Sequence, residues 1–156
     1  LYKRWVENCR KKVEELSGGR IGYVHIKGMD SPSFRKMYSE LLGRNRNKEA
    51  VVVDVRHNGG GWLHDDVVTL LGGKLVGTPV AGTMTAVWWE RQIDPSIVFG
   101  IPQVGCMDMQ GNYLENHTLQ PDILIYNTPE EAINGDDVQL KAAVEHLLKQ
   151  LTSKPE

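Results

Sequence analysis

The alternation of apolar and polar positions predicts helices and strands in turn through the first part of the chain. Apolar residues at helical spacing predict one helix over residues 1–16 and another over 31–42, the second started by Ser31 and Pro32. A mixed apolar pattern predicts a strand over residues 20–27. This order favours an α/β fold in which a right-handed crossover joins two parallel strands.

The most apolar stretch of the chain runs from Ala50 to Val55 and is interrupted only by Asp54. Its length and its β-branched residues predict a strand that is buried on both faces. Three glycines, Gly59 to Gly61, follow it, and a helical pattern then covers residues 62–71. The glycines therefore lie where a central strand passes into a helix, which is where open α/β sheets tend to place their functional groups.

The later part of the chain has shorter elements. Gly135, Asp136 and Asp137 are predicted to cap a last helix, whose apolar side reaches Leu151. No repeat, low-complexity segment or linker interrupts the sequence, so residues 1–156 are interpreted as a single domain. The short strands are predicted over residues 74–76, 83–91, 96–100, 105–109, 113–114 and 122–126, with a hairpin tip at 110–112.

Composition excludes several classes of function. Eighteen basic and 20 acidic side chains give a net charge of −2, which does not favour a nucleic-acid partner, and no apolar run is long enough to predict a membrane span. Cys9 and Cys106 stand far apart, without the spacing of a zinc or redox site. The amino end shows no signal-peptide pattern, but a mature or excised piece would lack one too, so the compartment is left open.

The glycine turn has two interpretations. Backbone amides there, next to a helix amino end, favour a negative charge or a developing oxyanion. A tight turn that merely requires small residues explains the same glycines.

His57, beside the glycines, is a candidate general base, and a side chain that simply fills the turn is the simpler interpretation. Acidic Asp65 and Asp66 follow His64 at a predicted helix start, where they suit the helix dipole better than a metal site.

The serines do not form a recognisable nucleophile motif. None lies in a Gly-x-Ser-x-Gly elbow, and none occurs between Ser39 and Ser96, the span that contains the glycine turn. The chain has six serines: Ser17, Ser31, Ser33, Ser39, Ser96 and Ser153.

Five segments, in order, resemble the tricorn-core and carboxy-terminal-processing (tail-specific) serine peptidases. The strand and glycine turn at residues 51–61 resemble the signature of that family. The matching segments cover about residues 20 to 150, with residues 1–17 as an amino-terminal linker helix. The other four segments are residues 20–26, the Gly-Thr segment at 75–83, the Glu-Asn and Pro-Asp-Ile residues within 111–123, and the acidic turn at 135–140.

This resemblance implies a crotonase-like (ClpP/crotonase type) mixed sheet with flanking helices, and no metal or organic cofactor. It implies a peptide or protein substrate that pairs as an added strand. The amide of Gly59 or Gly60 would stabilise the oxyanion, and Glu115 would support the catalytic hydroxyl network. The stretch from Thr83 to Trp89 would lie near the substrate channel.

Two departures from the family pattern affect the expected activity. The family has a strand, the nucleophile serine and a helix before the Gly-Thr segment, whereas here Leu71 is followed at once by Gly72, Gly73 and Lys74. The base histidine of the tricorn branch belongs to an earlier region that has no counterpart here. The lysine of the other branch would follow Gly82 and Thr83, where residues 84–86 contain none.

The sequence therefore predicts the core catalytic domain of a serine peptidase, truncated by an internal deletion and inactive because its nucleophile is absent. The gap is either an engineered deletion or a segment left out of the sequence. A non-catalytic peptide-binding or engineered scaffold domain is the alternative, and an acyl-thioester enzyme is a remote third. Removing a strand and a helix exposes apolar surface, so a homo-oligomer is expected.

Overall fold

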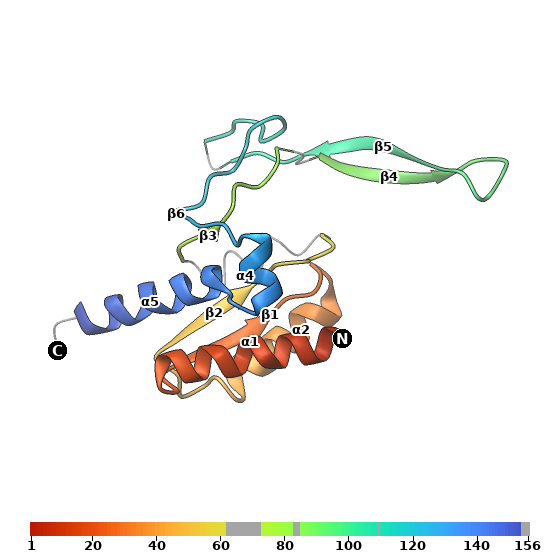
Figure 1. Ribbon diagram of the computed structural model, residues 1–156. Helices are drawn as coiled ribbons and strands as arrows, with labels where there is room; N and C mark the ends of the chain where they lie inside the picture. The colour runs from red at the N-terminus through yellow and green to blue at the C-terminus, as the bar shows by residue number, and fades with distance from the viewer. Residues whose placement is uncertain (62–72, 83–84, 109, 154–156) are drawn as a thin grey trace. The chain divides into compact units, whose positions relative to one another are not determined.

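The computed structural model describes residues 1–61, 73–82, 85–108 and 110–153. The chain divides into two compact units, which are described separately below (Figure 1). Unit 1 comprises Leu1–Val76 and Ile125–Glu156, and unit 2 comprises Gly77–Leu124. The expectation of one domain over residues 1–156 stays a prediction.

Unit 1 is built on two parallel strands, β1 (Ile21–His25) and β2 (Ala50–Asp54). Ile21 lies opposite Ala50, and His25 lies opposite Asp54, which confirms the predicted parallel pair. The described part of the same unit contains the helices α1 (Tyr2–Ser17), α2 (Ser31–Leu42), α4 (Pro129–Asn134) and α5 (Val138–Ser153) (Figure 1).

Helices α1 and α5 pack with β1 to form the larger apolar cluster of unit 1. Residues 1–17, predicted as a linker helix, thus contribute three buried side chains to a core. A smaller cluster joins α2 to the sheet through Val24, Ile26 and Met37. The buried members of the larger cluster are Val6, Cys9, Val13, Ile21, Tyr23, Leu140 and Val144.

Two local predictions in unit 1 were wrong. Residues Ala50 to Val53 of β2 are half-buried rather than buried on both faces, and Asp54 is the buried residue of the strand. Helix α2 is capped by Asp30, not by Ser31, because the Asp30 carboxylate accepts a hydrogen bond from the Ser33 N–H at 2.8 Å. An aspartate in extended conformation is as good an N-cap as a serine.

Unit 2 is a region of short pairings around one long hairpin. Strands β4 (Thr85–Arg91) and β5 (Val98–Gly105) are antiparallel, and β3 (Val76–Gly77) pairs with β6 (Ile123–Leu124). The strand predicted at 96–100 is confirmed over Val98–Gly100, but β5 continues to Gly105. The strand predicted at 105–109 meets β5 only at Gly105, and residue 109 lies outside the described residues. The expected buried strand at 122–126 reduces to β6, in which Leu124 is exposed.

Some predictions fall outside the described residues. The helix expected over residues 62–71 and the path from Leu71 to Lys74 cannot be compared, since residues 62–72 are not described. Within the described ranges, no helix is long and apolar enough to cross a membrane.

Substitution of Met37 tests how much the smaller apolar cluster contributes to stability. We expect Met37→Ala to lower the free energy of unfolding by about 2–5 kcal/mol, because it removes a side chain that is almost fully buried. Leu42→Ala, on the same helix but with an exposed side chain, is the matched control and should stay within about 0.5 kcal/mol of the parent. Urea titrations followed by far-ultraviolet circular dichroism measure both, and equal losses would contradict the assignment.

Candidate functional site

The glycine turn after β2 is hydrogen-bonded to the segment that follows β1. The Gly59 N–H donates to the Lys27 carbonyl at 3.2 Å, and the Met29 N–H donates to the Gly60 carbonyl at 2.8 Å. The side chain of Asn58 stabilises the turn: its Nδ2 group donates to the Ile26 carbonyl, and its Oδ1 accepts the Gly60 N–H at 2.7 Å. The turn is therefore an ordered part of unit 1.

Glycine is required at Gly61. Its φ of 137° is rarely adopted by L-residues, and a Cβ there would lie 2.3 Å from the Met29 carbonyl oxygen. The close approach of the two backbones at this point forms an isolated parallel bridge between Met29 and Gly61. The sequence interpretation of a turn that needs small residues is therefore correct for Gly61.

The amides predicted to hold an oxyanion already have acceptors. The Gly59 N–H bonds to Lys27, and the Gly60 N–H bonds to Asn58. An incoming oxyanion would have to replace one of these hydrogen bonds before it could be stabilised. The oxyanion role of Gly59 or Gly60 stays a prediction, with this reorganisation as its cost.

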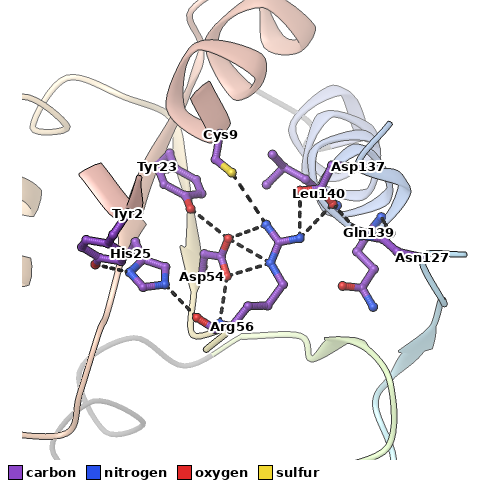
Figure 2. Close-up of polar contacts among 10 residues, drawn as sticks. All are labelled: Tyr2, Cys9, Tyr23, His25, Asp54, Arg56, Asn127, Asp137, Gln139 and Leu140. Carbon is purple, nitrogen blue, oxygen red and sulfur yellow. Dashed lines mark hydrogen bonds and ion pairs between the residues drawn. The ribbon is translucent and has the colours of Figure 1, made fainter. Parts of the chain in front are cut away.

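Histidines and aromatic rings gather beside the turn. The Trp5 ring lies edge-on to His25 and to His57, at 5.1 Å and 5.4 Å between ring centroids. His25 Nε2 lies 2.8 Å from the Arg56 carbonyl oxygen, and its Nδ1 lies 2.7 Å from the Tyr2 hydroxyl (Figure 2). Because a carbonyl only accepts, Nε2 donates to the Arg56 carbonyl, and Nδ1 shares the second hydrogen bond with the Tyr2 hydroxyl.

Arg56 connects the end of β2 to the start of α5. Its Nη2 lies 2.6 Å from Asp54 Oδ2, and its Nη1 lies 2.8 Å from Asp137 Oδ2. The Nε group adds hydrogen bonds to both Asp54 oxygens, and the Arg56 N–H donates to Asp54 Oδ1 at 3.0 Å. Figure 2 shows the guanidinium between the two carboxylates, with the Tyr23 hydroxyl donating to Asp54 at 2.8 Å.

These contacts shift the ionisation of the cluster. Burial by itself raises the pKa of Asp54, but the hydrogen bonds and charge of Arg56 outweigh it and lower that pKa below its ordinary value near 3.8. Burial, reinforced by Asp54, raises the pKa of Tyr23. For Arg56, burial opposes the charge, while Asp54 and Asp137 raise its pKa, so the guanidinium stays protonated. The cluster thus has fixed charges at neutral pH.

Asp137 also positions helix α5. Its Oδ1 accepts the Leu140 N–H at 3.1 Å, and its carbonyl accepts the Lys141 N–H, the pattern of a helix N-cap. Asn127 supports it by donating to Asp137 and by accepting the Gln139 N–H at 3.0 Å (Figure 2). The acidic turn predicted at residues 135–137 therefore caps α5 as expected, through Asp137.

Glu115 lies in unit 2, where its carboxylate accepts a hydrogen bond from the Thr85 hydroxyl at 2.6 Å. The neighbouring Asn116 N–H donates to the Gly82 carbonyl at 2.7 Å, and a Cβ on Gly82 would lie 2.6 Å from the His117 nitrogen. Two segments that the sequence analysis singled out separately, residues 75–83 and 111–123, thus touch within one unit. Gly59 and Gly60 belong to unit 1, whereas Glu115 belongs to unit 2.

Some of the serine hydroxyls bond to local partners. Ser17 donates to the Val13 carbonyl and accepts the Ile21 N–H, and Ser96 bonds to Asp94. Across the described residues, which include all six serines, no serine hydroxyl bonds to a histidine or a lysine. The same residues contain no group of three or more His, Cys, Asp or Glu side chains that could hold a metal ion.

Sequence reasoning missed the cluster around Arg56. Its signal was present, because a buried strand of valines that contains one aspartate requires a nearby cation. Arg56 follows Asp54 by two residues, and Asp137 was already assigned to a helix cap. What the sequence did not show is that one guanidinium serves both carboxylates.

Residues 20–72 match the model of Peptidase family S41. A protein described as "Tricorn protease homolog", from Saccharolobus solfataricus, is 26% identical over 202 residues and covers 97% of this chain. The "Putative Tricorn-like protease C-terminal subunit" of Sulfurisphaera tokodaii is 27% identical over 205 residues and covers 99%. The chain spans only 19% and 24% of the lengths of these two relatives.

A solved structure, "Crystal structure of the tricorn protease", superposes with a TM-score of 0.84. The superposition covers 97% of this chain and 20% of the chain of that structure, at 22% sequence identity. The fold is therefore an α/β fold of the kind found in part of that protease, with small sheets and helices. Together with the sequence matches, this supports a relationship to tricorn-like S41 peptidases.

Substitution of Asp54 tests how much the charged cluster of Asp54, Arg56 and Asp137 contributes to stability. Because its pKa is lowered on folding, Asp54 stabilises the folded chain above its unfolded value near 3.8, and this stability is lost as the pH falls below that value. We expect Asp54→Asn to lower the free energy of unfolding at pH 7 by about 3–5 kcal/mol, since it leaves a partly buried guanidinium short of one carboxylate. The loss should shrink between about pH 5 and pH 2.

Asp136→Asn is the matched control, because Asp136 is exposed and lies next to the N-cap. It should change the free energy of unfolding by less than about 0.5 kcal/mol at either pH. Denaturant titrations at pH 7 and pH 3 measure both variants. A cost of Asp54→Asn that does not depend on pH would show that its charge is not the stabilising feature.

Proposed function

We propose that this chain is a core segment of a tricorn-like serine peptidase that lacks the segment carrying the nucleophile, and that it does not hydrolyse peptides by itself. One observation carries the proposal. The alignment with the Saccharolobus protein extends over 202 residues although the chain has only 156, so the relative has about 50 residues within the aligned span that have no counterpart here.

The limit of the family match supports the same interpretation. The match to the Peptidase family S41 model ends at residue 72. This is where the sequence passes directly from the predicted helix to Gly73, Lys74 and the Gly-Thr segment. About 50 residues are enough for a strand, a short nucleophile turn and a helix. An internal deletion at this point accounts for the missing serine without disturbing the flanking motifs.

The proposed inactivity follows from the chemistry that remains. Hydrolysis through an acyl-enzyme begins with attack of a hydroxyl that a base has deprotonated. The hydroxyls of Ser17 and Ser96 bond to local partners, and the Gly59 and Gly60 amides are occupied. In the proposed intact enzyme, one of these amides would stabilise the oxyanion, and Glu115 would support the hydroxyl network through a contact like the one it makes to Thr85.

Peptides or proteins are the proposed substrates of the complete enzyme, and the fold is proposed to be crotonase-like.

A homo-oligomer is part of the same proposal. Large apolar side chains remain exposed in the described residues, among them Trp88, Trp89 and Phe99, each more than half exposed. Contiguous apolar surface of this kind commonly marks an interaction site.

A serine-directed covalent probe tests the absence of the nucleophile. We expect no labelling of this chain by a fluorophosphonate and no turnover of a fluorogenic peptide panel, because no serine hydroxyl in the described part of the chain bonds to a histidine or a lysine. The full-length Saccharolobus relative, treated in parallel, is the positive control. Stoichiometric labelling of any serine in this chain, located by peptide mass spectrometry, would overturn the proposal.

A non-catalytic peptide-binding domain is the second candidate. It is favoured by the occupied amides of Gly59 and Gly60, which leave the glycine turn satisfied without a ligand. It predicts that fluorescent extended peptides bind without cleavage, with a saturable rise in fluorescence anisotropy. Absence of saturable binding across the panel would exclude this candidate while leaving the truncated-peptidase proposal intact.

A further inference from the structure

The β4–β5 hairpin exposes large apolar side chains along most of its length. Trp88, Trp89 and Phe99 are 56%, 66% and 60% exposed. A two-stranded hairpin is marginally stable in water, and natural proteins seldom leave one this apolar without a covering partner. Other exposed apolar residues of the hairpin are Ile93, Ile97, Val98, Ile101 and Val104.

The backbone geometry identifies the free edge of β4. The Gln92 N–H donates to the Ile97 carbonyl at 3.1 Å, so Gln92 directs its backbone groups toward β5. Antiparallel pairs alternate in this respect, and therefore Val87, Trp89 and Arg91 direct theirs to the open side. This edge runs over seven residues without proline or lysine, and its charged residues, Glu90 and Arg91, lie at one end.

The free edge of β5 is different. Val87 lies opposite Pro102, which places Pro102 at a position that faces away from β4. Proline has no N–H to donate, so the ladder on that side is interrupted. Gly100, two residues earlier, weakens the same edge. Only the β4 edge offers a continuous set of hydrogen-bonding groups.

Resting on the homo-oligomer of the proposed function, we propose that a second copy of this chain pairs with the free edge of β4 around a two-fold axis at Trp88, forming a four-stranded antiparallel sheet. Trp88 is the midpoint of the strand Thr85–Arg91, so pairing along its whole length fixes the register. Trp88 then lies opposite the partner's Trp88, and Val87 lies opposite the partner's Trp89. Aromatic and β-branched residues are favourable cross-strand neighbours.

Charge complementarity supports this occupant. In the proposed register, the partner's Arg91 lies opposite Thr85, whose hydroxyl donates to the Glu115 carboxylate at 2.6 Å. The two-fold axis repeats this approach of a guanidinium to a carboxylate, so two pairs of opposite charge flank the central tryptophans. A two-fold interface brings the same surface of each copy together, and here that surface carries both signs.

The size of the contact predicts a weak dimer. Side chains stand roughly perpendicular to a sheet, so pairing at the strand edge buries the backbone groups of β4 and only the flanks of Trp88 and Trp89. The contact therefore lies at the low end of specific interfaces, and we expect a weak association.

Sedimentation equilibrium of the whole chain, from about 1 to 300 µM, tests the association. We expect a monomer–dimer equilibrium that Val87→Pro weakens at least tenfold, because it removes an N–H from the β4 edge. Val98→Pro is the matched control, since Val98 lies opposite Arg91 and its N–H faces the free edge of β5. It should change the constant less than twofold, and circular dichroism should show that both variants keep the fold.

Disulfide formation tests the register. In a Cys106→Ser background, Trp88→Cys should form a covalent dimer on mild oxidation, because non-hydrogen-bonded partners have Cα atoms about 4.5 Å apart. Glu90→Cys should not, since the two copies of that residue would be about 14 Å apart. Cys9 is buried and is common to both variants.

Three results would overturn the proposal. The first is a monomer at every concentration, including one that binds an extended peptide along β4 instead. The second is equal weakening by Val87→Pro and Val98→Pro. The third is faster cross-linking through residue 90 than through residue 88.

Discussion

The position of Arg56 between Asp54 and Asp137 is the constraint on which unit 1 depends. A carboxylate buried at the end of a strand of valines is tolerated only with a cation and hydrogen-bond donors around it, and Arg56 and Tyr23 supply both. The same guanidinium binds the residue that caps α5. The strand that leads into the glycine turn and the helix near the carboxyl end are thereby fixed to each other by charge as well as by apolar packing.

The elements of unit 1 could be predicted because each has a strong local pattern. The spacing of Val6, Cys9 and Val13 marks the buried side of α1, and the β-branched run at residues 50–53 marks β2. The parallel pairing followed from the order of elements alone. The family resemblance also came from short segments, and two of them, at residues 75–83 and 111–123, are in contact in the structure.

The rest depended on tertiary contacts that no local pattern specifies. The half-buried state of Ala50 to Val53 depends on what covers the sheet, and the length of β5 depends on its pairing with β4. Among the candidate site residues, the glycines were located correctly in a turn. The acceptors of their amides, the Lys27 carbonyl and the Asn58 side chain, could not be predicted from sequence spacing. Whether Glu115 and the glycine turn act together stays a prediction.

Pro102 has a consequence for how far association can proceed. A hairpin with two competent edges can recruit neighbours on both sides, and repeated addition of strands then builds a fibre. Within this hairpin, hydrogen-bonding capacity is continuous on β4 alone, so the hairpin offers one pairing edge, which a single partner satisfies. A hairpin this rich in exposed tryptophan and isoleucine would accordingly form a closed pair and resist open-ended polymerisation through its own edges.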